Sequence, residues 1–298
     1  MTGTISLQPI LDDACRQLGL SSTGARLLHA HSNTVYLLPR EQAIARISGN
    51  DHAGLAPRAS LAITRWLAQQ GVPVTEPLID RAADVDGMTV TIWHYYPQCG
   101  RDAPPAGELA RILRTLHALP GEIPFALRDY IPLQGLTNTL RDPHASSALT
   151  DDERGWLDQQ TRDHITAYHR LRSHLGRGLV HGDAYLGNTL WGPDRLLLGD
   201  WDEISIAPRE LDLVNTYQSV RFGALEEDDL DQFCNAYGWD VRGWEGFEAL
   251  RSMRDLHTLN GYVRRASRGD QRAAQELRTR IRSLREPTSK DTPWHAVD

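Results

Sequence analysis

The sequence predicts an α+β protein of two lobes, with a small β-rich lobe in residues 1–97 and a mostly helical lobe in residues 98–298. Short β-rich runs follow one another near the N-terminus, which indicates a hairpin. Farther along the chain, apolar residues repeat at the spacing of an α-helix over several stretches. The sequence PQCGRDAPPAG lies between the two patterns, and its proline and glycine content is typical of a linker.

The small lobe is predicted to consist of a helix, three strands, a second helix and two further strands. Gly19 and Gly71 are expected to end the two helices, because glycine is common just past a helix C-terminus. The segments are residues 5–18, a strand before His31, residues 35–38, 43–47 and 55–70, and two strands around the Asp86-Gly87 turn.

The large lobe is predicted to be mostly helical as far as residue 285. One helix is expected to stop at Pro120-Gly121, and a later one at Gly176. Each carries four apolar residues at the spacing that forms one buried face. These residues are Leu109, Ile112, Leu113 and Leu116 in the first helix, and Ile165, Tyr168, Leu171 and Leu175 in the second.

The composition favours a globular cytoplasmic protein. Hydrophobic residues make up 40% of the chain and charged residues 24%, and a net charge of -7 argues against a nucleic-acid-binding surface. Cys15, Cys99 and Cys234 are too widely spaced for a disulfide framework or a zinc site, which fits a reducing compartment. We expect neither a signal peptide nor a membrane helix, because the N-terminus lacks the required pattern and no run of about 18 apolar residues occurs.

The strongest functional signal is the stretch LVHGDAYLGNTLWGPDRLLLGDWDE, residues 179–203, in which acids lie among aliphatic residues. Carboxylates in such surroundings are usually paired or bind a metal ion. Asp183 precedes Asn188 by five positions and Asp200 by 17. If residues 179–180 and 196–198 paired as strands, the chain would return Asp200 to the side of Asp183 and Asn188.

These three side chains fit the chemistry of phosphoryl transfer. Asn188 and Asp200 offer hard oxygen ligands for a Mg²⁺ ion that carries nucleotide phosphates. Asp183 would accept the proton of an incoming hydroxyl group, as an aspartate at this spacing from an asparagine does in protein kinases.

The motifs HGD with Asn188, GDWD and the later PRELDL together resemble the aminoglycoside phosphotransferase and choline kinase family, whose fold is kinase-like with two lobes. The resemblance covers most of the chain. SNTVYLL is similar to the nucleotide loop and second strand of that family, AIARI to its third strand, and RWLAQQGVPVTEPL to its helix and following strand. LRTLHALP, AYGWD and RSMRDLHTL are similar to segments of its bacterial members.

The resemblance implies a role for each motif residue. Asp183 would be the catalytic base, His181 would support the catalytic loop, and Asp212 would hydrogen-bond that loop from below. Asn188 and Asp200 would bind Mg²⁺. The nucleotide, ATP or GTP, would contact Ser32 and Asn33 in the loop HAHSNT, Arg46 at the α- and β-phosphates, and a hinge at Trp93, His94 and Tyr95.

Two features depart from the family pattern. The loop HAHSNT lacks the glycines of a protein-kinase phosphate loop. At the helix position where the family often has a glutamate that braces the basic residue, this chain has Ser60. The sequence therefore does not show which acid would pair with Arg46.

The acceptor implied by the resemblance is a small hydroxylated molecule, such as an aminoglycoside, another antibiotic, an amino sugar or an amino alcohol. Asp202, Glu203 and the net charge of -7 favour a cationic acceptor. Only residues 203–209 separate the GDWD turn from the next helix, which is too short for the regulated segment of a protein kinase.

Other functions remain open at this point. A nucleotide-binding pseudokinase without transfer activity is one alternative, and a metal-dependent hydrolase is another. Neither nucleic acid nor a membrane is expected as a partner, and the oligomeric state is open.

Overall fold

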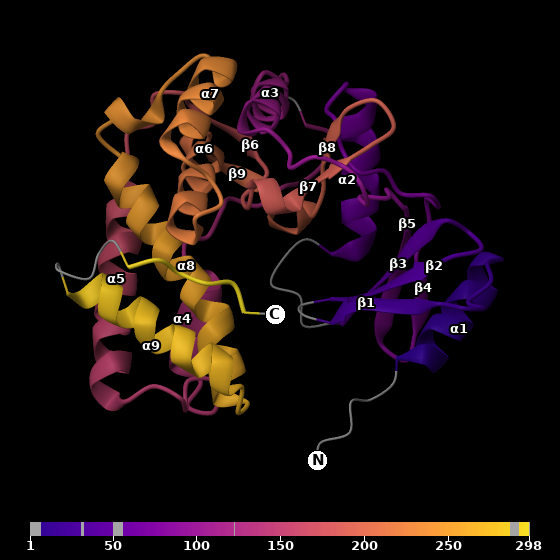
Figure 1. The fold of residues 1–298 in the computed structure, drawn as a ribbon, viewed down its shortest axis with the longest axis horizontal. Helices are drawn as coiled ribbons and strands as arrows, with labels where there is room; N and C mark the ends of the chain where they lie inside the picture. Colours follow the sequence, from indigo (N-terminus) through magenta and orange to yellow (C-terminus); the bar gives the residue numbers. More distant parts are fainter. Residues whose placement is uncertain (1–6, 31–32, 50–55, 122, 287–291, 298) are drawn as a thin grey trace. The chain divides into compact units, whose positions relative to one another are not determined.

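The computed structural model describes residues 7–30, 33–49, 56–121, 123–286 and 292–297. The chain divides into two compact units (Figure 1). The first unit contains residues 1–104, 118–126 and 188–204, and the second contains residues 105–117, 127–187 and 205–298. The assignment of nucleotide binding to residues 1–97 and of catalysis to residues 98–298 stays a prediction.

The first unit contains a five-stranded antiparallel sheet in the order β1-β2-β3-β5-β4, with helix α1 against it. The predicted hairpin is confirmed, since β2 and β3 pair from Thr34–Ile47 to Leu38–Ala43. Helix α1 ends at Gly19, whose left-handed backbone (φ 76°) is accessible to glycine without strain. The elements are α1 (Gln8–Leu18), β1 (Arg26–Ala30), β2 (Thr34–Leu38), β3 (Ala43–Ser48), α2 (Pro57–Gln69), β4 (Ala83–Val85) and β5 (Met88–His94).

Strand β3 shows how the sheet separates its core face from its functional face. Ala43, Ala45 and Ile47 are buried in the cluster that α1 covers. Successive side chains of a strand point to opposite faces, so Arg46 leaves the sheet on the side away from this cluster. The alternation of apolar residues with Arg46 along β3 thus places the arginine on the face of the sheet opposite the core.

A second hairpin in the first unit is formed by β7 (Thr189–Trp191) and β8 (Leu196–Leu198). Its strand β8 is fixed to residues 73–75 by backbone hydrogen bonds from Leu198 N to Pro73 O (2.9 Å) and from Thr75 N to Leu198 O (3.0 Å). The Gln98 side chain hydrogen-bonds both the N–H and the carbonyl of Trp191 (2.9 and 3.1 Å).

The strand pairing expected for this region is wrong. Residues 179–180 lie in β6 (Arg177–Val180), which pairs with β9 (Ser205–Pro208) in the second unit. Residues 196–198 pair with β7 instead. The physical reason is that residues 189–198 reverse direction within a short turn and satisfy their own backbone groups locally, which leaves β6 to a later strand.

The second unit is mostly helical, as predicted, and β6 and β9 form its small sheet. Helices α3 and α7 pack closely: a Cβ on Gly107 would lie 3.5 Å from the Ala236 side chain. Within the described residues, no helix combines the length and the apolar composition needed to cross a membrane. The helices are α3 (Ala106–His117), α4 (Gln134–Arg141), α5 (Asp151–Arg170), α6 (Glu210–Tyr217), α7 (Glu227–Tyr237), α8 (Phe247–Ser267) and α9 (Gln271–Arg285).

Helix α5 ends earlier than its apolar pattern predicted. It stops at Arg170, so Leu171 and Leu175 lie beyond it. The buried carboxylate of Glu210 accepts hydrogen bonds from the N–H groups of His174 (2.6 Å) and Leu175 (2.8 Å). A side chain far along the sequence therefore binds backbone donors that a longer helix would have used internally.

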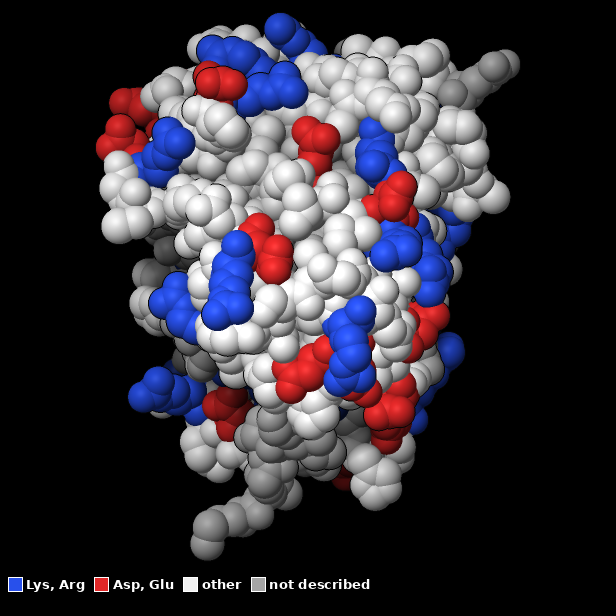
Figure 2. Space-filling view, turned by 90° about the vertical axis from the view of Figure 1, so that its right-hand side faces the viewer, with Lys and Arg blue, Asp and Glu red and all other residues white. Residues whose placement is uncertain are grey.

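Charges on the surface are mixed in sign. On the face drawn in Figure 2, Lys and Arg side chains lie among Asp and Glu side chains. Ion pairs of this kind in the first unit join Arg58 to Asp84 (2.6 Å) and Arg65 to Asp80 (3.1 Å). Such alternation gives that face no extended basic surface among the described residues, of the kind that nucleic-acid backbones require.

Candidate active site

The loop that follows β6 is held by the carboxylate of Asp212 at the start of α6. Asp212 is fully buried, and it accepts hydrogen bonds from the N–H groups of His181 (2.7 Å) and Gly182 (2.8 Å). The Asn215 side chain donates to the carbonyl of Gly182 (3.1 Å), whose φ of 88° favours glycine. The prediction that Asp212 hydrogen-bonds this loop is confirmed.

A histidine that the sequence reasoning did not single out completes this support. His117, at the end of α3, has Nε2 3.1 Å from Asp212 Oδ2 and Nδ1 2.9 Å from the Tyr237 hydroxyl. Burial alone would raise the pKa of Asp212, but the hydrogen bond and charge of His117, with the nearby His181, lower it below its ordinary value. The segment LRTLHALP, which contains His117, was the available signal.

Asp183 forms an ion pair with an arginine from α8. Arg254 Nη2 lies 2.5 Å from Asp183 Oδ1, and the Arg254 side chain is only 4% exposed, compared with 30% for Asp183. The Asp183 N–H donates to Nδ1 of His181 (3.3 Å). The loop therefore fixes the backbone of Asp183 and Arg254 fixes its carboxylate. Arg254 lies in the segment RSMRDLHTL, yet no pattern in the sequence pairs it with Asp183.

Asp183 lines a cavity of about 450 Å³ in the second unit. This volume is within the range of small-molecule sites, about 300–1,000 Å³. Aromatic side chains, Tyr185, Phe222 and Tyr262, line it together with the guanidinium groups of Arg254 and Arg280.

His257 lies in the same lining and is neutral at pH 7. Burial of its imidazole and the neighbouring positive charge of Arg254 lower the pKa of His257 to about 4. The negative charge of Asp183 acts in the opposite direction but does not outweigh them. The cationic groups of the lining at pH 7 are therefore the two arginines.

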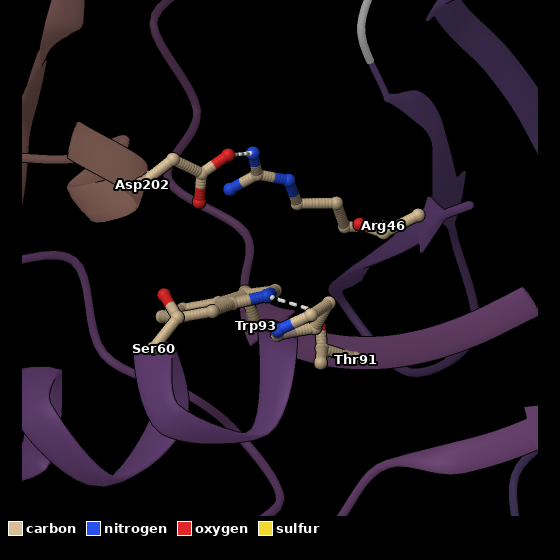
Figure 3. A pocket seen from close by; sticks show the side chains of 7 residues that line it. Arg46, Ser60, Thr91, Trp93 and Asp202 are labelled. Atoms are coloured by element: carbon tan, nitrogen blue, oxygen red, sulfur yellow. Dashed lines mark hydrogen bonds and ion pairs between the residues drawn. The ribbon is translucent and has the colours of Figure 1, made fainter. Parts of the chain in front are cut away.

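In the first unit, Arg46 is held by two carboxylates of the GDWD turn. Its Nη2 lies 3.2 Å from Asp200 Oδ1 and forms a second ion pair with Asp202 Oδ2. Figure 3 shows Arg46 extending from β3 to Asp202, with Ser60 on α2 and Trp93 at the same pocket. The sequence did not reveal the acidic partners of Arg46. They are Asp200 and Asp202, which lie 154 and 156 positions after it in the chain.

Asn188 and Asp200 flank the β7–β8 hairpin of the first unit, Asn188 directly before β7 and Asp200 two residues after β8. The Gly199 N–H donates to the Asn188 carbonyl (2.8 Å), which fixes the residue before Asp200 to Asn188. Asp200 has a left-handed backbone (φ 58°, ψ 59°), which is uncommon outside glycine and recurs at functional sites. Its side chain is 51% exposed.

These two donors suit Mg²⁺ better than a transition metal. No group of three or more His, Cys, Asp or Glu side chains that could hold a metal ion occurs in the described part of the chain. Mg²⁺ needs only one or two carboxylates because phosphate oxygens and water complete its shell. Asn188 and Asp200 would leave the other positions of a Mg²⁺ shell to phosphate oxygens and water.

The other predicted nucleotide contacts are distributed as follows. Asn33 accepts a hydrogen bond from Ser48 Oγ (2.8 Å) and donates to Asp202 (3.5 Å), so it belongs to the Arg46 cluster. Ser32 lies outside the described residues. Glu203 follows Asp202 in the short 3-10 turn Trp201–Glu203. Their assignments to nucleotide and acceptor stay predictions.

Two backbone N–H groups of the predicted hinge are already hydrogen-bonded within the first unit. Trp93 donates its indole N–H to Thr91 Oγ1 (2.8 Å) and lines the pocket beside Arg46. The N–H groups of His94 and Tyr95 donate to backbone carbonyls of Glu76 and Gln42 (3.1 Å each). Neither N–H is open to a base, so an adenine at this segment would have to use other backbone groups.

The chain matches the model of the phosphotransferase enzyme family, APH, over residues 23–250. No curated protein matches it. Its structure is similar to that of an amicoumacin kinase, hAmiN, in complex with AMP-PNP, Ca²⁺ and Ami, with a TM-score of 0.71 and 16% identity over 98% of this chain and 95% of that one.

Two further kinases have similar structures. A microcompartment-associated aminopropanol kinase gives a TM-score of 0.67 and 18% identity, covering 96% of this chain and 99% of that one. The choline kinase LicA from Streptococcus pneumoniae gives 0.64 and 16%, covering 93% and 99%. At these identities the likeness establishes the fold, and the predicted α+β kinase-like class is confirmed.

Proposed function

The chain belongs to the phosphotransferase enzyme family, and from this premise we propose that it transfers the γ-phosphate of ATP to a hydroxyl group of a small molecule. The observation that carries the proposal is Asp183, held on a loop by the buried Asp212 at the wall of a cavity of about 450 Å³. A carboxylate so placed can reach a bound hydroxyl group, and the cavity gives an acceptor room to bind.

In the proposed reaction Asp183 is the general base. The acceptor oxygen forms a bond to the γ-phosphorus while the bond from that phosphorus to the bridging oxygen of ADP breaks. The hydroxyl proton passes to the Asp183 carboxylate. The ion pair with Arg254 (2.5 Å) orients this carboxylate before the acceptor binds, which reduces the reorganisation needed in the transition state.

The nucleotide half of the proposal assigns Asn188 and Asp200 to Mg²⁺ and Arg46 to the phosphates. A bound Mg²⁺ would neutralise charge on the β- and γ-phosphate oxygens. The amicoumacin kinase was solved with AMP-PNP and Ca²⁺, which supports a nucleotide and a divalent cation for this fold. ATP is the nucleotide we propose, with GTP as the competitor to test.

The charges around the cavity bear on which acceptors fit. Among its described lining residues Asp183 is the only acid, and Arg254 already pairs with it. Arg280 adds a second guanidinium, whose Nε is paired with the carboxylate of Glu276 (2.9 Å). A polyamine such as an aminoglycoside brings several ammonium groups, for which the described lining offers a single carboxylate that is already paired with Arg254. This lining favours a neutral or acidic hydroxylated acceptor, against the amine that Asp202 and Glu203 led us to expect.

A panel of acceptors matched in size but not in charge tests both the proposed transfer and the proposed preference for neutral or acidic acceptors. ADP release from Mg-ATP is measured with gluconate, glucose and glucosamine, with glycerate, glycerol and serinol, and with one aminoglycoside. We expect acceptor-dependent release that is greatest with neutral or acidic members. A consistent preference for the amines would restore the cationic acceptor. ATP binding with no release for any member would favour the pseudokinase.

A further inference from the structure

We propose that Asp202 is the positioning residue of Arg46, so that the GDWD turn, which also contains the proposed metal ligand Asp200, supplies the carboxylate that α2 lacks. The inference rests on the proposed role of Arg46 at the nucleotide phosphates. Asp202 would hold the guanidinium in place and would not touch the reacting atoms.

The hydrogen bond and ion pair of Asp202 within the described part of the chain lead to Arg46 and to its neighbour Asn33. Its Oδ2 forms the ion pair with Arg46 and accepts a hydrogen bond from Asn33 Nδ2 (3.5 Å). Asn33 is fixed in turn by Ser48 Oγ (2.8 Å), from the same strand β3 as Arg46. The side chains of Arg46 and Asp202 are only 17% and 22% exposed, so water screens this pair less than a surface pair.

Helix α2 offers no competing acid. Its sequence, PRASLAITRWLAQ, contains neither aspartate nor glutamate. Ser60 and Pro57 are the residues of α2 that line the pocket with Arg46 and Asp202, and Ser60 is 3% exposed (Figure 3). Within the described residues its Oγ has no hydrogen-bond partner. Both ion pairs described above for Arg46 are made with carboxylates of the GDWD turn.

The two acids of the turn differ in how freely each can leave Arg46 for another partner. Asp200 is 51% exposed and lies 3.2 Å from Arg46, whereas Asp202 is less than half as exposed and is also bound by Asn33. If Asp200 turns to a metal ion, Asp202 still holds Arg46. Because both acids lie on the GDWD turn, Arg46 is positioned only when this turn is formed.

A double-mutant cycle on ATP binding tests the proposal. Calorimetry with and without Mg²⁺ gives the ATP Kd of the wild type, of Asp202→Asn, of Arg46→Met and of the double variant. We expect Asp202→Asn to weaken binding about tenfold, and the double variant to be no weaker than Arg46→Met, since residues that act as one unit are not additive. The matched control for Asp202→Asn is Asp194→Asn, which makes the same substitution at an exposed aspartate in the β7–β8 turn.

Rescue from α2 gives a readout that a merely structural role would not move. Ser60→Glu in the Asp202→Asn background supplies a carboxylate from the facing helix and is expected to recover most of the lost affinity. Additive losses in the cycle, or an Asp202→Asn variant that binds ATP like the wild type, would overturn the proposal. A wild type that binds no ATP would instead refute the proposed function.

Discussion

Both units contain an arginine paired with an acid of the motif that the sequence singled out, but the two pairs are built differently. In the first unit Arg46 is shared by Asp200 and Asp202, and its side chain is 17% exposed. In the second unit Arg254 is 4% exposed and pairs with Asp183. A shared cation at a partly open pocket can exchange a carboxylate for a ligand. A buried cation holds its carboxylate in one orientation, because separating a buried pair exposes an uncompensated charge.

This difference matches the tasks we propose for the two sites. A nucleotide with its metal ion arrives and leaves in every cycle, so Asp200 must be able to change partners. A general base must keep one orientation towards the hydroxyl group. The comparison predicts that changes in the second unit affect turnover and that changes in the first affect nucleotide binding.

The largest expected effect is on turnover, from Asp183→Asn. An amide cannot accept the hydroxyl proton, and a positioned general base contributes about 10²- to 10⁴-fold to the rate. We expect kcat to fall by this amount while the Kd for Mg-ATP stays within about twofold of the wild type. Steady-state ADP release and calorimetry measure the two quantities, with Asp194→Asn as control. An unchanged kcat would remove Asp183 from the chemistry.

Asp200→Ala is expected to have a smaller effect than Asp183→Asn, and this effect is on the binding of ATP with Mg²⁺. Asn188 alone is a neutral ligand that holds a hard cation weakly. We expect Mg²⁺ to stop improving ATP affinity, a loss of about 10- to 100-fold, while binding of metal-free ATP is retained because Arg46 keeps Asp202. Calorimetry with ATP, with and without Mg²⁺, measures this. Metal dependence equal to that of the wild type would exclude Asp200 as the ligand.

The smallest expected effect concerns stability and pH. The pKa of His257 is lowered from 6.5 to about 4, so the unfolded state binds a proton that the folded state rejects between these values. Stability should therefore fall as the pH drops from 6.5 towards 4, by about 1–3 kcal/mol from this group. His257→Gln should remove that part of the pH dependence, seen as a smaller fall in Tm between pH 7 and pH 5. An identical pH profile in the variant would mean that His257 is solvated and unperturbed.

Residues close together in the sequence could be interpreted correctly before the structure was known. The pairing of β2 with β3 follows from alternation and a short turn. The support of the loop by Asp212, 30 and 31 positions away, was instead implied by the family resemblance that the motif PRELDL carries. The end of α5 could not be predicted, since it depends on Glu210, which is 35 and 36 positions away from the N–H groups it binds. The same holds for His117, which meets Asp212 at a separation of 95 positions.

The sequence by itself determined the α+β class, because strand and helix periods are local properties. Its motifs carried the family resemblance that implied the kinase-like fold and the set of motif side chains. Only the tertiary structure decided which side chains those residues meet. It paired β6 with β9, gave Arg46 the carboxylate of Asp202 where α2 has Ser60, and brought Arg254 to Asp183. Such contacts arise from burial and charge pairing between residues from 25 positions apart (Val180 and Ser205) to 156 positions apart (Arg46 and Asp202), where no sequence period links one partner to the other.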